Sequence, residues 1–219
     1  MRKLTALLLA LLAPLAFAGN QQYEPLAIDV QMELSSAINE ETSPSLAFSP
    51  DGATPYIAFN TVDEARAWLD PMSKKLERRM PDRRTREEFL LTAHYEATRA
   101  GLDPQLVLAL IQVESNFRKY AVSSAGARGY MQVMPFWTKL IGKPEHNLFH
   151  LRRNLRYGCV IFKYYLKIEK GDLYRALGRY NGSLGRAEYP VLVVRAWVSN
   201  WKHPVRAAAG IGHGAGPGK

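Results

Sequence analysis

The sequence has little of what would cross-link or anchor a small fold. Its 219 residues contain one cysteine, Cys159, so no disulfide can form within the chain. Cysteine and histidine also lack the spacing of a structural zinc site. The apolar run over residues 4–15 is shorter than the roughly 20 residues that span a bilayer. Side-chain packing must therefore stabilise the fold, and 47% hydrophobic residues are enough for a sizeable core.

The apolar run at the start of the chain has the pattern of an export signal. Arg2 and Lys3 precede it, and Ala16 and Ala18 supply small residues before a cleavage site at Gly19. We expect residues 1–18 to be a signal peptide and the protein to be exported, periplasmic and soluble after cleavage, with no stable membrane span. Because glycine and not cysteine follows the cut, nothing indicates a lipoprotein.

Acidic residues are scarce in the second half of the chain. Residues 115–219 carry eighteen Lys or Arg and four Asp or Glu. Such a charge excess predicts either an anionic partner or a solvated basic face. An exported chain without a recognisable nucleic-acid motif is expected to meet a cell-wall polymer or an anionic membrane surface rather than nucleic acid.

The amino-terminal part predicts an extension in two sections. Residues 19–60 are rich in proline and serine and show no sustained periodicity, so we expect them to be mostly irregular. Residues 61–81 carry apolar residues at helical spacing, interrupted at Pro71, which predicts one or two helices. We therefore expect an extension over residues 19–84, partly irregular and then helical.

Helix signals continue from residue 85. Thr85 and Glu88 form a capping box that predicts the start of a helix ending at Gly101. Asp103, followed by Pro104, predicts the start of another helix that runs to about residue 119.

The rest of the chain is also predicted to be helical. Residues 155–166 carry an apolar helix face that includes Cys159, which we expect to be buried as a small hydrophobe. Asp172 predicts the cap of a short helix, whereas residues 191–194 could form either a strand or a helix. Residues 202–219 are expected to be a disordered tail. The expected fold class is all-α.

Glu114 lies on an unexpected face of the helix predicted over residues 105–119. On a helical wheel Gln105, Gln112 and Asn116 fall in one polar stripe, whereas Glu114 points to the apolar side. A carboxylate in apolar surroundings loses hydration, which disfavours its charged form, so we expect its pKa to be raised. A raised pKa suits a general acid.

Two downstream segments could line a cleft with Glu114. Residues 121–129 form a glycine-bearing loop through which the backbone can approach a ligand closely, and residues 180–183 offer a polar turn. The other interpretation is a structural glutamate paired with a buried Arg or Lys. The residues by themselves leave a catalytic and a structural role open.

These segments also resemble a known family. Glu114-Ser115 is followed by A-x-S-x-x-G-A-x-G-x-M-Q-x-M-P over residues 121–135, then by Tyr180-Asn181-Gly182 and Tyr189-Pro190. In order and spacing this set is similar to the motifs of the soluble lytic transglycosylases (SLT family). The resemblance covers residues 85–201 and implies a lysozyme-like helical domain there.

The resemblance implies a role for each matching residue. Glu114 matches the catalytic acid/base of the family. The positions that match the sugar-binding groove are Ser123, Gln132, Met134, Tyr180, Asn181 and Tyr189. The chain departs from the family at Tyr130, where leucine is usual, and at Phe136-Trp137, which add aromatic residues. These departures concern the sugar-binding subsites of the groove rather than the catalytic reaction.

The implied reaction uses one carboxylate, whereas ordinary glycosidases use two. No Asp or Glu occurs between Ser115 and Pro144, where a lysozyme-like loop would supply the second. In the family's reaction the glutamate protonates the glycosidic oxygen and then removes the proton from the muramyl C6 hydroxyl. The resemblance implies no metal and no cofactor. It implies peptidoglycan glycan strands as the substrate and cell-wall protein complexes as further partners.

Two other functions fit the same residues. One is a non-catalytic peptidoglycan-binding or assembly module that keeps the fold without turnover. The other is a muramidase that hydrolyses the bond with water.

Overall fold

The computed structural model describes residues 21–39, 59 and 61–202. The expected signal peptide and residues 203–219 of the expected tail lie outside this part. Within it the chain is helical, and its only β-structure is two isolated bridges, Val122 with Arg128 and Arg128 with Val133. The expected all-α class is confirmed for the described residues.

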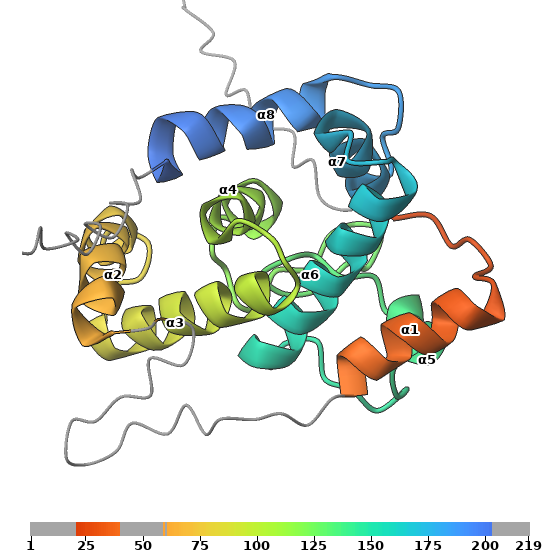
Figure 1. Ribbon diagram of the computed structural model, residues 1–219, viewed down its shortest axis with the longest axis horizontal. Helices are drawn as coiled ribbons and strands as arrows, with labels where there is room; N and C mark the ends of the chain where they lie inside the picture. Colours follow the sequence, from red (N-terminus) through yellow and green to blue (C-terminus); the bar gives the residue numbers. More distant parts are fainter. Residues whose placement is uncertain (1–20, 40–58, 60, 203–219) are drawn as a thin grey trace, which may run out of the picture.

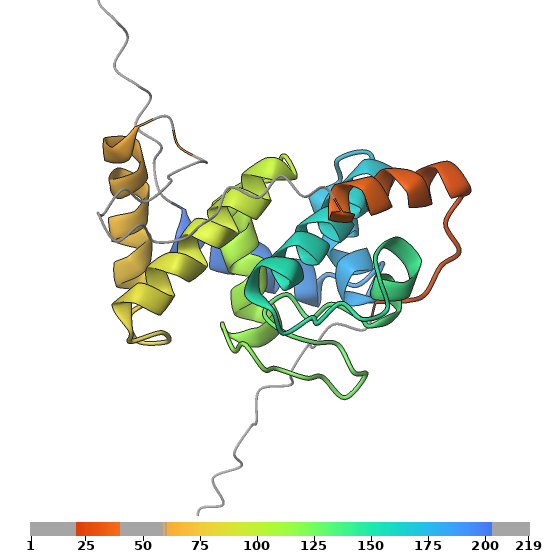
Figure 2. The same ribbon diagram turned by 90° about the horizontal axis from the view of Figure 1, so that it is seen from below.

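Helix α4 lies at the centre of the structure (Figure 1) and packs against α3, α8 and η1, a π-helical turn. Seen from below in Figure 2, α2 lies at one end and α1 with α5 at the other. The helices are α1 (Ile28–Asn39), α2 (Val62–Leu76), α3 (Arg83–Arg99), α4 (Pro104–Ser115), α5 (Phe136–Ile141), α6 (Leu151–Ile168), α7 (Leu173–Asn181), α8 (Glu188–Ala196) and η1 (Trp197–Trp201).

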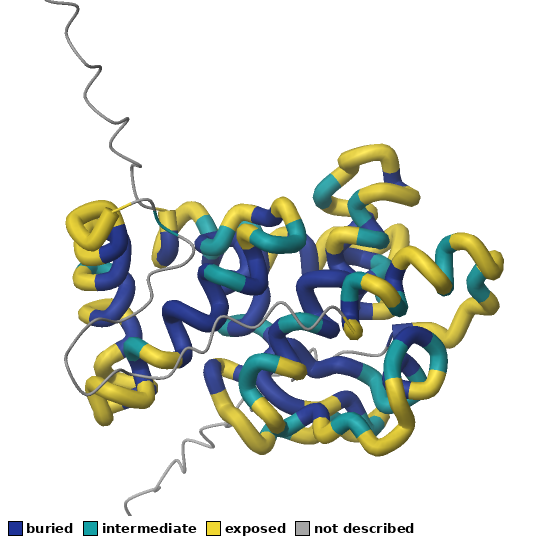
Figure 3. Tube along the Cα trace, turned by 60° about the horizontal axis from the view of Figure 1, so that its bottom comes forward, coloured by how far each residue is buried: buried dark blue, intermediate teal, exposed yellow. Residues whose placement is uncertain are grey.

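The core follows from the position of α4. All residues from 105 to 111 are buried, and Figure 3 shows continuous burial along the central helices with exposure at the loops and ends. A helix that is apolar nearly all round cannot leave one face in water. The neighbouring helices therefore surround α4, and its last turn is held inside the molecule.

Aspartate side chains set three helix starts. Asp103 accepts hydrogen bonds from the backbone N–H groups of Gln105 (2.7 Å) and Leu106 (3.2 Å), as the sequence predicts. Asp172 likewise accepts from Arg175 N (3.0 Å). The predicted capping box at Thr85 is wrong, because Asp82 caps α3 by accepting from Thr85 N at 2.8 Å. An Asp at N-cap bonds the third helical N–H, so the N-cap of α3 lies three residues earlier than predicted.

Helix α4 ends sooner than residue 119. Asn116 and Phe117 both have positive φ (49° and 63°), and Asn116 is the left-handed C-cap. Asparagine tolerates this conformation better than most residues, so the chain can leave the helix there. Glu114 consequently sits in the last turn of α4 rather than in its middle.

Two open expectations are decided by packing. Residues 62–76 form one continuous helix with Pro71 inside it, and residues 191–194 are helical within α8. Cys159 is 1% exposed, and burial raises the pKa of its thiol, so the prediction that Cys159 is buried is confirmed. No helix in the part of the chain that the structure describes is long and apolar enough to cross a bilayer.

Helix α1 was not expected, because residues 19–60 were predicted to be mostly irregular. Leu34 and Ile38 are buried where α1 packs against α6 and α5. Arg99 of α3 donates to the Ala37 carbonyl at 2.6 Å, near the end of α1 where carbonyls lack partners within the helix. These contacts come from distant parts of the chain, so local periodicity did not reveal the helix.

His94 links α2 to α3 through aromatic packing. Its ring stacks on Phe59 at 4.0 Å and meets Trp68 edge-on at 4.6 Å. Burial lowers the pKa of His94 from 6.5 to about 4, with a smaller opposing effect from the Glu64 charge. The histidine is therefore neutral in the folded protein at neutral pH.

This pKa predicts acid destabilisation that originates at His94. The folded pKa lies below the unfolded one, so the contribution is complete above pH 6.5 and is lost as the pH falls toward 4. The loss amounts to about 3 kcal/mol at pH 4. We expect the His94→Phe variant to lose less stability than the wild type between pH 6.5 and 4, measured by urea unfolding. Equal losses in both proteins would contradict the assignment.

Candidate active site

Glu114 is held inside the molecule by α8. It is 5% exposed, and the Tyr189 hydroxyl donates a hydrogen bond to its Oε1. The inward orientation predicted for Glu114 is confirmed. Tyr189 is 1% exposed, and burial followed by the Glu114 charge raises the pKa of its phenol, which therefore stays a donor at neutral pH.

The helical wheel was wrong about the opposite face of α4. Gln105, expected at the solvent, is 6% exposed. Gln112 is half-buried and accepts from Trp201 Nε1 at 2.8 Å and from Asn200 Nδ2 at 3.2 Å. Asn116 is exposed as expected. Because η1 covers this side of α4 at Gln112, the side chain of Gln112 is bound by protein groups.

The structural interpretation of Glu114 can be compared with another buried glutamate. The Glu96 side chain is 0% exposed and pairs with Arg152 (3.0 Å) and Arg156 (3.1 Å). Glu96 therefore has the arginine-paired arrangement that a structural role predicts. Glu114 accepts a hydrogen bond from the neutral phenol of Tyr189.

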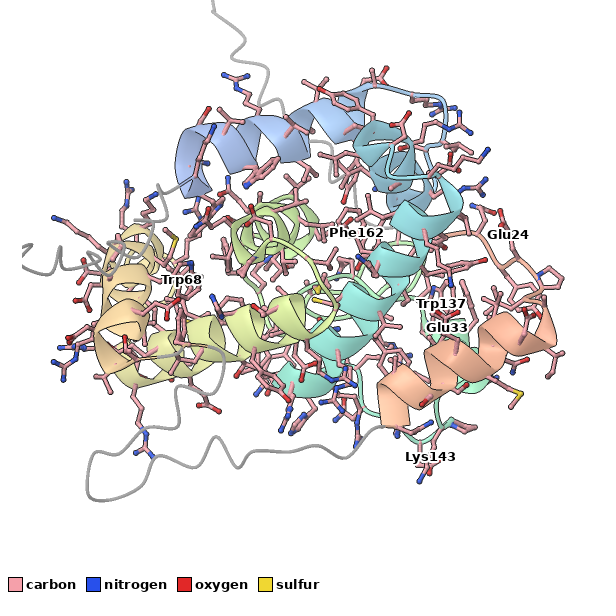
Figure 4. All side chains as sticks on the ribbon, viewed as in Figure 1. Glu24, Glu33, Trp68, Trp137, Lys143 and Phe162 are labelled. Carbon is pink, nitrogen blue, oxygen red and sulfur yellow. The ribbon has the colours of Figure 1, made fainter. Side chains whose placement is uncertain are left out.

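Tyr180 lies close enough to Glu114 to feel its charge. It is fully buried, its hydroxyl donates to the Met131 carbonyl at 2.7 Å, and its ring meets Phe162 edge-on at 5.7 Å. Burial is the largest cause of its raised pKa and the Glu114 charge is the next. In the view of Figure 4 the label of Phe162, a residue of α6, stands between α4 and α6. Tyr180, Tyr189 and Glu114 thus form one buried group.

The loop over residues 121–135 is closed by its own hydrogen bonds. Ser123 Oγ accepts from Ala127 N at 3.0 Å. Gln132 is 1% exposed and donates from Nε2 to the carbonyls of Ala121 (3.1 Å) and Gly129 (2.9 Å). In these bonds both predicted groove residues hold the shape of the loop.

One of the two glycines of this loop, Gly129, meets protein rather than open space. Gly129 has φ +75°, and a Cβ there would lie 2.5 Å from Asn154 Nδ2 and 2.6 Å from the Leu148 carbonyl. The close approach expected at this glycine is therefore to α6 and its preceding loop. Gly126, by contrast, has nothing within 4 Å of such a Cβ.

Asn154 is a residue that sequence reasoning missed. It is 0% exposed on α6, accepts from Met131 N (2.8 Å) and donates to the carbonyls of Arg128 (2.9 Å) and Leu148 (2.8 Å). One helical turn later, Gly158 leaves room for the Met131 side chain, since a Cβ there would lie 2.3 Å from its Sδ. Asn154 and Gly158 share one face of α6. A polar residue followed four positions later by a glycine was therefore the signal in the sequence that could have indicated this contact.

The remaining predicted residues lie at the edge of this group. Met134 is half-buried, and its backbone N–H donates to Gln21 Oε1 at 3.3 Å. Asn181, the last residue of α7, is 6% exposed and therefore is not the surface residue that a polar turn suggests. Within the described residues, no group of three or more His, Cys, Asp or Glu is arranged to hold a metal ion.

Comparisons with known proteins now bear on this site. Residues 92–191 match the family model described as "Transglycosylase SLT domain". This stretch includes Glu114 and every predicted groove residue. The chain carries an SLT domain.

Curated relatives match over short stretches. Membrane-bound lytic murein transglycosylase C of Actinobacillus pleuropneumoniae is 46% identical over 48 residues, which is 22% of this chain and 13% of that protein. The transglycosylase of Enterobacteria phage PRD1 is 33% identical over 89 residues, which is 41% of this chain and 32% of that protein. The chain thus spans a minor part of each relative's length.

Solved structures with weaker likeness include two lytic transglycosylases. An inactive mutant of Slt from Pseudomonas aeruginosa has a TM-score of 0.40 and 24% identity, covering 64% of this chain and 24% of that one. The 70 kDa soluble lytic transglycosylase of Escherichia coli has a TM-score of 0.40 and 16% identity, covering 61% and 26%.

The buried position of Asn154 predicts that replacing it lowers the stability of the protein strongly. Asn154→Ala deletes two buried hydrogen bonds and one that is partly buried, which stabilise by about 1 kcal/mol each, so we expect a loss of about 3 kcal/mol in the free energy of unfolding. Asn147→Ala is the control, because it removes one exposed hydrogen bond from the same region. Denaturant unfolding of both variants measures the difference, and equal small losses would show that Asn154 does not hold the loop.

Proposed function

We propose that this protein is a peptidoglycan lytic transglycosylase with Glu114 as its single acid/base. The observation that carries the proposal is the buried Glu114 carboxylate, hydrogen-bonded by Tyr189 inside the segment that matches the SLT domain. A carboxyl group removed from water and aimed by a neutral donor is suited to proton transfer. That Glu114 is protonated near neutral pH stays a prediction.

The proposed reaction begins with proton donation by Glu114. The proton goes to the glycosidic oxygen of the β-1,4 bond between N-acetylmuramic acid and N-acetylglucosamine, and the bond to the muramyl C1 breaks. The acetamido group of the substrate stabilises the positive charge. Glu114, now a carboxylate, takes the proton of the muramyl C6 hydroxyl as that oxygen bonds to C1. The products are a 1,6-anhydromuramyl end and a free N-acetylglucosamine hydroxyl, with no water consumed.

The two tyrosines support this cycle in different ways. The Tyr189 hydroxyl fixes the position of one Glu114 oxygen, Oε1, by donating a hydrogen bond to it. Tyr180 connects the Glu114 group to the loop through the Met131 carbonyl. We propose Ser123, Gln132, Met134 and Asn181, together with these tyrosines, as the sugar-binding residues. For Ser123 and Gln132 this role is shared with holding the loop.

We also propose the cellular setting that the sequence suggests. Residues 85–201 would form the catalytic domain of an exported, periplasmic enzyme that needs no cofactor. The basic residues of the second half of the chain suit the acidic peptide stems of peptidoglycan. Association with other cell-wall proteins is a further expectation.

The decisive variant is Glu114→Gln. The amide has nearly the same volume but cannot transfer the proton, so we expect a folded protein whose cleavage of purified sacculi falls by at least about 100-fold. Glu145→Gln, an exposed change, is the control and should keep full activity.

Product analysis by mass spectrometry separates the competing functions. Wild-type digests should contain 1,6-anhydromuropeptides. Reducing muramyl ends would instead identify a hydrolytic muramidase, and the absence of any product would identify a non-catalytic binding module. Near wild-type turnover by a folded Glu114→Gln protein would exclude the proposed mechanism.

Tyr189→Phe tests the positioning of Glu114. A hydroxyl that donates to a carboxylate stabilises its charged form, so without it the acid persists to higher pH. We expect kcat to fall about tenfold and the alkaline limb of the kcat/KM profile to move to higher pH. Tyr174→Phe on the exposed face of α7 is the matched control. A lower kcat with an unshifted pH profile would assign Tyr189 to packing alone.

A further inference from the structure

The segment before α1 enters the proposed substrate site. Gln21 is 2% exposed although it comes from the amino-terminal extension, more than 100 residues from its partners. In Figure 1 this red segment starts beside α7 and runs along the surface to the start of α1. We call residues 21–27 the strap.

The Gln21 side chain is bound by groups of the site. Its Oε1 accepts hydrogen bonds from Met134 N (3.3 Å) and from Trp137 Nε1 (3.0 Å). The Gln21 amide also lies beside the Tyr180 hydroxyl, where it opposes the rise in the pKa of that phenol. Met134 and Tyr180 are two of the proposed sugar-binding residues, so the strap and the substrate would use the same surface.

The chemistry of this contact matches the substrate. Gln21 offers a carboxamide oxygen to two N–H donors, and every N-acetylated sugar of peptidoglycan carries a carboxamide in its acetamido group. The Gln21 Nε2 atom is buried beside the Tyr180 hydroxyl but makes no hydrogen bond of normal geometry. A poorly satisfied buried donor weakens the binding of this side chain, which favours its replacement by a better ligand.

The outer part of the strap is held by contacts that can open. Glu24 pairs with Arg179 at 3.3 Å, with the Glu24 side chain 57% exposed, and the exposed Tyr23 ring meets Phe136 at 5.6 Å. Exposed ion pairs of this kind stabilise little. Figure 4 labels Glu24 and Trp137 on the same side of α6, next to α1. Leu26, next to α1, packs against the core, so the strap can open over residues 21–25 while Leu26 and α1 stay packed.

We propose that the strap is autoinhibitory: Gln21 occupies a subsite for an N-acetylated sugar, and the strap must withdraw before a glycan strand binds. The proposal rests on the proposed function for the identity of the ligand. A protein whose binding-competent form is only partly populated binds its ligand with correspondingly lower apparent affinity. Weakening the strap should therefore tighten sugar binding.

The test uses the purified protein with its whole extension in place and tetra-N-acetylchitotetraose as the probe. Gln21→Ala removes the occupying carboxamide, and we expect the Kd from calorimetry to fall roughly three- to tenfold. On sacculi, KM should fall by a similar factor while kcat changes little. Gln22→Ala is the matched control, since it deletes the same side chain from the exposed neighbouring position.

A second variant acts from outside the site. Glu24→Lys places a like charge beside Arg179 and should loosen the strap, again lowering the Kd for the probe. The melting temperature of each variant is measured in parallel. If Gln21 is only a structural latch, Gln21→Ala will lower the melting temperature and leave the Kd unchanged or raise it, and that result overturns the proposal.

The two proposals fail in different ways. If Gln21→Ala and Glu24→Lys bind the probe more tightly but no variant forms anhydro products, the strap proposal is supported and the transglycosylase proposal is rejected. If anhydro products form but all variants bind the probe with equal affinity, the transglycosylase proposal is supported and the strap proposal is rejected. If no variant binds the probe, the proposal that the strap competes with the sugar is also rejected.

Discussion

The packing of α8 and η1 around α4 depends on keeping the carboxylate of Glu114 at the buried end of α4. A carboxylate taken out of water needs a hydrogen-bond donor, and Tyr189 of α8 supplies one. This places α8 across the end of α4, and η1 then covers the other side of α4 through the bond from Trp201 to Gln112. The burial of one acidic group thus requires that the last helices of the chain close over the central one.

The second constraint is the attachment of the loop to α6. Asn154 binds one N–H and two carbonyls of the loop and its neighbour, and Gly158 lets the Met131 side chain approach the helix. Because Tyr180 donates to the Met131 carbonyl, the same loop residue touches both α6 and the Glu114 group. The loop is therefore held in a fixed position, whereas the outer part of the strap, at Glu24, has an exposed and weak attachment.

Some features could be predicted because their causes are local. The caps at Asp103 and Asp172, the burial of Cys159 and the inward position of Glu114 follow from side chains within a few residues. The capping box at Thr85 failed because Asp82 competes for the same N–H and lies closer to the true start. Gln105 was placed at the solvent because a helical wheel contains no information on which neighbours cover a helix.

The sequence by itself determined the all-α class, the acid at position 114 and the motif set around it, since periodicity, caps and motif spacing are written in consecutive residues. The tertiary structure decided what distant residues do to one another. It brought Tyr189 to Glu114 and Asn154 to the loop, formed α1 through contacts with α3, α5 and α6, and placed Gln21 against Met134 and Trp137. Each of these bonds joins residues more than twenty positions apart, where local propensity has no bearing and only packing fixes the partner.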